Sequence, residues 1–75
     1  MLKKDCCVGS RVKAITNADG EYETLNEIGT IEQVDREDCT VNFDNSVGGW
    51  RDESLNIRNG HGLFVAYEEL ELINE

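Results

Sequence analysis

Short runs of β-branched and aromatic residues, separated by segments rich in Gly, Asn and Asp, constrain what this chain can fold into more than any other feature. Residues 39–44 show the pattern best, because Cys39, Val41 and Phe43 alternate with polar residues. Such alternation is typical of a half-buried strand in an antiparallel sheet. The sequence therefore predicts an all-β fold, a single small barrel of about five antiparallel strands.

We expect strands at residues 11–15, 28–34, 39–44, 63–66 and 71–73. A short helical turn over Tyr67–Leu70 is expected just before the last strand, and a charged hairpin turn over Asp35–Asp38. Residues 45–62 contain four of the seven glycines, which favours one long loop. Long ordered loops often carry function, so this loop is the first candidate for a binding surface.

The length of 75 residues allows one domain with one small core. No stretch approaches the roughly 20 apolar residues that span a bilayer, and the first residues lack the apolar segment of a signal peptide. We therefore expect a cytoplasmic protein without membrane contact. The three cysteines are an odd number and cannot all pair within one chain, so in a reducing cytosol we expect thiols.

Charge is distributed unevenly along the chain. Sixteen acidic residues against seven basic ones give a net charge of −9, yet Asp5 is the only acid before residue 16. We expect residues 1–7 to be a flexible basic arm, followed by the barrel over residues 8–75. The acidic remainder repels the phosphate backbone, which argues against direct nucleic-acid binding. The expected partner is a protein with a basic surface.

The apolar runs and glycines follow one another in the order of a known fold. The segments concerned are Val8–Val12, Ile28–Ile31, Val41–Asp44, Gly48–Gly49, Gly60–Val65 and Tyr67–Leu72. Together they resemble SH3-like β-barrels of the KOW, Tudor and mind-bomb type, and look most like small SH3-like proteins of phages and bacteria. The resemblance implies a barrel with a short 3₁₀ turn before its last strand, and a binding role.

In barrels of this kind, ligands usually meet a groove between the first long loop, the later loops and the 3₁₀ turn. The resemblance thus implies a partner-binding site made of Tyr22, Asp44, Trp50, Asp52, Glu53 and Tyr67. A rigid aromatic ring such as that of Trp50 suits a binding hot spot, because it loses little entropy on binding. The alternative is that Trp50 caps one open end of the core.

The leading hypothesis is therefore a non-enzymatic protein-binding module, a small phage-type regulator or inhibitor of a host protein that acts through its 45–62 loop and aromatic groove. A second hypothesis comes from the acidic runs. It is a nucleic-acid mimic that inhibits a DNA- or RNA-binding enzyme, of anti-restriction or anti-CRISPR type. Its carboxylates would be those of Asp35, Glu37, Asp38, Glu68, Glu69 and Glu71. The same acids also suit a solvated surface that keeps a small barrel soluble.

Metal binding and catalysis have weaker signals. Cys6, Cys7, Cys39 and His61 match the ligand count of a Cys₃His zinc site. Adjacent cysteines seldom bind one ion together, and there is no Cys-x-x-Cys pair, so we expect no metal and no cofactor. His61 lies between two glycines and is expected to mark a tight turn, with no nucleophile placed near it. We therefore expect a protein that is not an enzyme.

Overall fold

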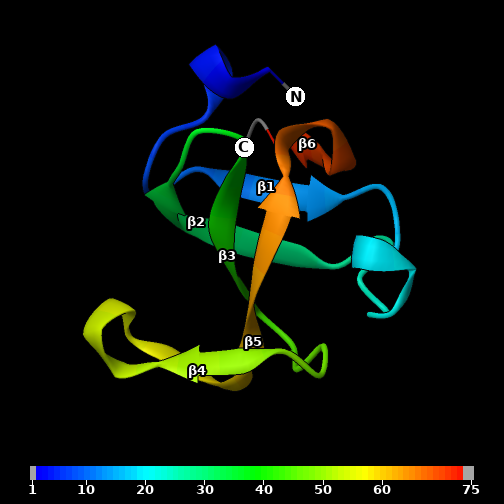
Figure 1. Ribbon diagram of the computed structural model, residues 1–75, viewed down its shortest axis with the longest axis vertical. Coiled ribbons are helices and arrows are strands. Elements are labelled where there is room, and N and C mark those ends of the chain that lie inside the picture. The colour runs from blue at the N-terminus through cyan, green and yellow to red at the C-terminus, as the bar shows by residue number, and fades with distance from the viewer. Residues whose placement is uncertain (1, 74–75) are drawn as a thin grey trace.

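In the computed structural model, which describes residues 2–73, six strands form one antiparallel sheet (Figure 1). The strands are β1 (Arg11–Ala14), β2 (Ile28–Val34), β3 (Asp38–Phe43), β4 (Trp50–Asp52), β5 (Ile57–Ala66) and β6 (Leu70–Leu72). They lie in the order β4-β5-β3-β2-β1-β6. The predicted all-β class is confirmed, and the predicted bounds of β1, β2, β3 and β6 agree to within one residue at each end.

The described chain has four short 3₁₀ turns, of which the last three connect strands. They are η1 (Lys3–Asp5), η2 (Ala18–Gly20), η3 (Glu53–Leu55) and η4 (Tyr67–Glu69). The last of them lies directly before β6, which confirms the helical turn predicted there. Between residues 2 and 73 we find no helix with the length and apolar character needed to cross a membrane.

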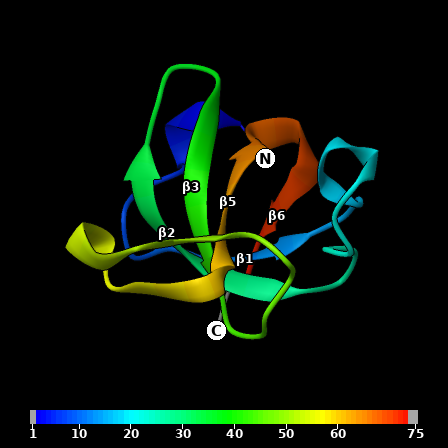
Figure 2. The same cartoon turned by 60° about the horizontal axis from the view of Figure 1, so that its bottom comes forward.

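The core is built from alternate residues of the strands. In β1, the buried Val12 and Ala14 alternate with the partly exposed Arg11 and Lys13. In β3, Cys39, Val41 and Phe43 are buried as the alternation predicted. Burying a side chain of this size contributes about 1.5–3 kcal/mol. The strands curl around this common centre, which gives the domain extents of 28 × 26 × 25 Å (Figure 2).

The predicted long loop over residues 45–62 is wrong, because this segment contains β4, η3 and the first part of β5. Asn56 adopts a left-handed conformation (φ 56°) that reverses the chain between β4 and β5. Trp50 pairs with Gly62 across the resulting hairpin. A Cβ atom at Gly62 would lie 2.8 Å from the Trp50 ring, so this glycine is required by packing. Its presence does not indicate a loop.

The N-terminal segment joins the core through one side chain. Cys6 is buried and belongs to the same apolar cluster as the strand residues. The backbone of Gly9 donates to the Ile31 carbonyl at 2.8 Å, and that of Ile31 donates to the Ser10 carbonyl at 2.9 Å. These bonds place the residues before β1 against β2. Residue 1 of the predicted arm and residues 74–75 of the predicted barrel lie outside the described residues.

Candidate functional site

Phe64 projects from the outer face of β5 with 56% of its surface exposed. Its neighbours Leu63 and Val65 point into the core, so the strand alternation places Phe64 on the opposite side. The Trp50 ring packs against it, with the ring centroids 4.9 Å apart and the planes tilted by 48°. Offset aromatic pairs of this kind contribute about 0.5–1.5 kcal/mol beyond the area they bury.

The backbone beneath this pair holds Trp50 in place. Gly62 leaves the space that the six-membered part of the indole occupies, and the Cγ2 atom of Ile57 lies against the same spot. Ile57 is buried, although it is not part of the main core cluster. Trp50 also packs against the main core cluster. We call Trp50, Ile57 and Phe64 the aromatic patch.

Thr40 lies on β3 next to the aromatic patch and is Phe64's partner in the β3–β5 register. Its side chain is fully buried on the outer side of the sheet. Within residues 2–73, its hydroxyl has no hydrogen-bond partner. A buried hydroxyl without a partner costs roughly 1–3 kcal/mol.

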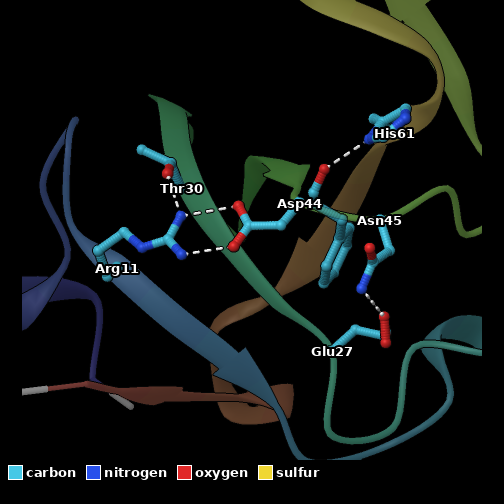
Figure 3. A network of polar contacts seen from close by, with 7 residues as sticks. Arg11, Glu27, Thr30, Asp44, Asn45 and His61 are labelled. Atoms are coloured by element: carbon cyan, nitrogen blue, oxygen red, sulfur yellow. Dashed lines mark hydrogen bonds and ion pairs between the residues drawn. The ribbon is translucent and has the colours of Figure 1, made fainter.

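Asp44, which was predicted as part of the partner-binding site, forms hydrogen bonds with Arg11 (Figure 3). The two guanidinium nitrogens donate to the two carboxylate oxygens at 2.8 and 2.5 Å, and Nη1 also donates to Thr30 Oγ1 at 2.8 Å. The Arg11 hydrogen bonds hold the pKa of Asp44 below its usual range. The Asp44 carboxylate stays ionised. Through Arg11 it joins the end of β3 to β1 and β2.

Two further polar contacts lie beside this pair (Figure 3). The Nδ1 atom of His61 is 2.7 Å from the Phe43 carbonyl, and the Asn45 amide donates to Glu27 Oε1 at 3.2 Å. His61 is therefore engaged with the backbone at the end of β3.

Asp52 and Glu53, the other two acids of the predicted partner-binding site, lie on the β4–β5 hairpin. Asp52 accepts hydrogen bonds from the backbone N–H of Ser54 at 2.9 Å and from its hydroxyl at 2.5 Å. These bonds lower the pKa of Asp52, and the carboxylate caps η3. Glu53 is exposed and lies 4.0 Å from Arg51. Both acids thus lie shortly after Trp50 in the chain, and the Asp52 carboxylate is engaged in the local turn.

The three predicted groove aromatics do not lie together. Tyr67 is buried, and its hydroxyl donates to the Asp35 carbonyl, so it is mainly a core residue. Burial raises the pKa of Tyr67. Tyr22 lines a different hollow, together with Glu21, Glu23 and Glu27. Trp50 instead packs against Phe64, which the sequence analysis left out of the site. The signal for Phe64 was its position between two core residues of an alternating strand.

Four of the six acids of the mimic hypothesis gather at one end of the barrel. Asp35 and Glu37 lie in the β2–β3 turn, and Asp38 begins β3, where it is paired with Ala66 directly before η4. Glu37, Asp38 and Glu68 line one hollow there, which Lys3 and Arg36 share. Glu71 lies on β6, 3.8 Å from Lys13. Glu69 lies in η4, where its carbonyl accepts from Ile15.

The four residues of the zinc alternative are found in different places. Cys6 and Cys39 are buried free thiols, and the Cys39 thiol donates to the Val65 carbonyl at 3.6 Å. Burial raises the pKa of Cys6, and raises that of Cys39 to about 12. Cys7 is exposed, with its sulfur 3.1 Å from the Ser10 hydroxyl, and His61 lies at the other end of β3. Among residues 2–73, no three His, Cys, Asp or Glu side chains are grouped to hold a metal ion.

These groups provide an exposed aromatic ring with a rigid support and acidic side chains nearby, which is the chemistry of a contact surface. Comparison of the chain with models of protein families, with curated proteins and with solved structures found no match. The function is therefore inferred from the chemistry of the site.

Proposed function

We propose that this chain is a non-enzymatic protein-binding module whose contact surface is the aromatic patch on the β4–β5 hairpin. The observation that carries the proposal is the exposed Phe64 ring, which packs against Trp50. Its neighbours on β5, Leu63 and Val65, are buried in the core. Binding hot spots are enriched in aromatic residues that are rigid before the partner arrives. Gly62 and Ile57 supply that rigidity by fixing the indole from below.

The partner is a protein that presents an apolar socket within a basic surface. The net charge of −9 favours such a surface, because opposite charge speeds encounter and excludes acidic competitors. Asp52 and Glu53 follow Trp50 after one intervening residue, Arg51, and supply negative charge near the patch. A second copy of the same acidic chain is disfavoured by the same charge.

The fold supports a kinship with SH3-like barrels as part of this proposal. The resemblance implies about five strands with a 3₁₀ turn before the last one, and η4 lies directly before β6. The short strand β4 is then an addition that carries Trp50 to the outer face. On this proposal the chain acts in the cytoplasm, as a phage-type regulator or inhibitor of a host protein.

The test is capture of partners from a bacterial lysate on the immobilised chain, with nuclease present, using Phe64→Ala and Trp50→Ala as variants. Loss of a hot-spot ring should weaken binding about 30-fold or more. Leu25→Ala is the matched control, since Leu25 is a similarly exposed apolar residue away from the patch. A partner held equally by the wild type and both aromatic variants would refute the proposal.

The mimic hypothesis is the second candidate, because Asp35, Glu37, Asp38 and Glu68 gather at one end of the barrel. Lys3 and Arg36 weaken the negative field there, which makes the aromatic patch the stronger candidate. Stepwise neutralisation of the four acids to Asn or Gln should weaken a mimic progressively, and its binding should fall steeply with salt. A mimic should also lose its partner to added DNA or RNA, and it should tolerate Phe64→Ala.

A further inference from the structure

The outer face of the sheet carries a carboxylate next to the aromatic patch. Asn42 lies on this face, because its neighbours Val41 and Phe43 are buried in the core. The Nδ2 atom of Asn42 donates to Glu32 Oε2 at 3.1 Å, which holds a carboxylate from β2 on the same face. Glu32 is partly exposed, and its carboxylate forms no ion pair within the described part of the chain.

The register of the strands places this carboxylate beside the two aromatic rings. Asn42 pairs with Gly62 on β5, and Gly62 pairs in turn with Trp50 on β4. The Trp50 ring lies over Gly62, since a Cβ atom there would be 2.8 Å from two of its ring atoms. Phe64 is the next outward residue on β5 and lies diagonal to Asn42, at the usual spacing of about 7–8 Å. The Glu32–Asn42 pair therefore borders the aromatic patch on its β3 side.

We propose that the partner protein places an arginine side chain against the exposed Phe64 ring, with its guanidinium donating to the Glu32 carboxylate. This inference rests on the proposed function, because it names the chemical group that the aromatic patch receives. A guanidinium is flat, so it can stack on a ring while the N–H donors at its edge reach a carboxylate. The arginine then forms one wall of the socket that receives Phe64, and the net charge of −9 attracts it.

Phe64 keeps a free surface for such a cation. Trp50 packs against it with the ring centroids 4.9 Å apart, yet 56% of the Phe64 surface stays exposed. Arg11, the basic residue of β1 on this face, is engaged elsewhere, because it donates to Asp44 and Thr30 (Figure 3). A cation on an exposed ring strengthens binding by about 2- to 5-fold, and an exposed ion pair adds a comparable factor.

The experiment titrates the full chain with three short acetylated peptides that differ at one position. That position is arginine, citrulline or lysine, placed between two leucines. Citrulline keeps the flat shape of arginine without its charge. The fluorescence of Trp50, the only tryptophan, and the NMR shifts of Trp50 and Gly62 report binding at the patch. The arginine peptide should bind about 5-fold or more tightly than the citrulline peptide, and the lysine peptide should fall between them.

Matched variants test the carboxylate and the ring separately. Glu32→Gln keeps the shape of the side chain and removes its charge, so the preference for arginine over citrulline should fall to about 2-fold, the share of the ring alone. Glu23→Gln makes the same change in charge at the hollow beside Tyr22 and should keep the full preference. Phe64→Ala should weaken the binding of all three peptides, because it removes the surface that they share.

The outcomes distinguish this inference from the proposed function. Equal binding of the three peptides that is lost in Phe64→Ala would overturn the arginine assignment and would still support the aromatic patch as a contact surface. A preference for arginine that is unchanged in Glu32→Gln would also overturn the inference. The same holds if no peptide shifts the signals of Trp50 and Gly62 at millimolar concentration. Capture of a partner that is lost in Phe64→Ala would then still uphold the proposed function.

Discussion

Arg11 and Asp44 form a two-point ion pair that ties the first strand of the sheet to the residue after β3. The carboxylate is about half exposed, at 49%, and the guanidinium is also bonded to Thr30. Bidentate arginine–carboxylate pairs are the stronger kind of surface ion pair, because both hydrogen bonds are charge-assisted. The pair therefore stabilises the side of the barrel where β1 and β2 meet the end of β3.

Asp44→Asn should lower the free energy of unfolding at neutral pH by roughly 0.5–1 kcal/mol, the range for a well-formed exposed pair. The folded pKa of Asp44 lies below that of an unfolded aspartate, about 3.9. Its stabilisation is therefore present above that unfolded value and is lost as pH falls through the lowered folded pKa. Urea unfolding at pH 7 and near pH 2 measures this.

The control for that prediction is Glu53→Gln. The Glu53–Arg51 pair is longer, at 4.0 Å, and both side chains are mostly exposed. It should change stability by less than about 0.3 kcal/mol at either pH. An equal loss of stability for Asp44→Asn at both pH values would contradict the ion-pair explanation.

Thr40→Val should raise the free energy of unfolding by up to about 1 kcal/mol, because it removes a buried hydroxyl that lacks a partner in the described chain. Thr24→Val is the matched control. Thr24 is equally buried, but its hydroxyl donates to the Thr16 carbonyl at 2.7 Å and accepts from the Ala18 N–H at 2.8 Å. That variant should cost about 1–3 kcal/mol. Denaturant titration of both variants measures whether the two substitutions change the free energy of unfolding in opposite directions.

Gly62→Ala should displace the Trp50 ring and cost about 1–3 kcal/mol, the usual range for overpacking. The new methyl group would lie 2.8 Å from two ring atoms of Trp50 and from Ile57. Trp50 is the only tryptophan, so its fluorescence spectrum reports the displacement directly. In the double variant with Trp50→Ala the glycine substitution should cost less, because the ring is gone. Simple additivity of the two costs would argue against the contact.

Phe64→Ala should leave stability within about 1 kcal/mol of the wild type, because its ring is more than half exposed. Phe43→Ala removes a ring of the same size from the core and should cost about 3–5 kcal/mol. Thermal unfolding of the two variants compares them. A large loss for Phe64→Ala would mean that the patch serves the fold and would weaken its assignment as a contact surface.

The strands with clear alternation could be predicted from the sequence, and β3 is the best case. Its inner residues are buried as expected, because a period of two needs only local information. The β4–β5 hairpin could not be predicted in this way. Gly60 and Gly62 looked like loop residues, whereas the structure uses Gly62 to admit the Trp50 ring from another strand. A requirement that arises from a distant side chain leaves no local pattern.

The candidate site was likewise predicted only in part from the sequence. Trp50 was identified because an aromatic ring near charges suits a binding surface, and it packs against the exposed Phe64 ring as well as against the core. Tyr67 was assigned to the same groove, yet its ring fills the core and its hydroxyl binds the β2–β3 turn. Aromatic residues next to turns occur in both settings, and only tertiary packing distinguishes them. The burial of Cys6 likewise depends on how the N-terminal segment folds back.

The pairing of β1 with β6 bears on how the chain is made. Val12, near the start, lies opposite Leu72, near the end, so β1 stays uncovered on one side until β6 has been synthesised. Pairings between such distant segments form slowly, because their loop must close before any contact is gained. While the ribosome is still translating the middle of the chain, β1 therefore presents an open edge to its surroundings. Premature termination before β6 would leave that edge exposed, and such fragments should aggregate or be degraded.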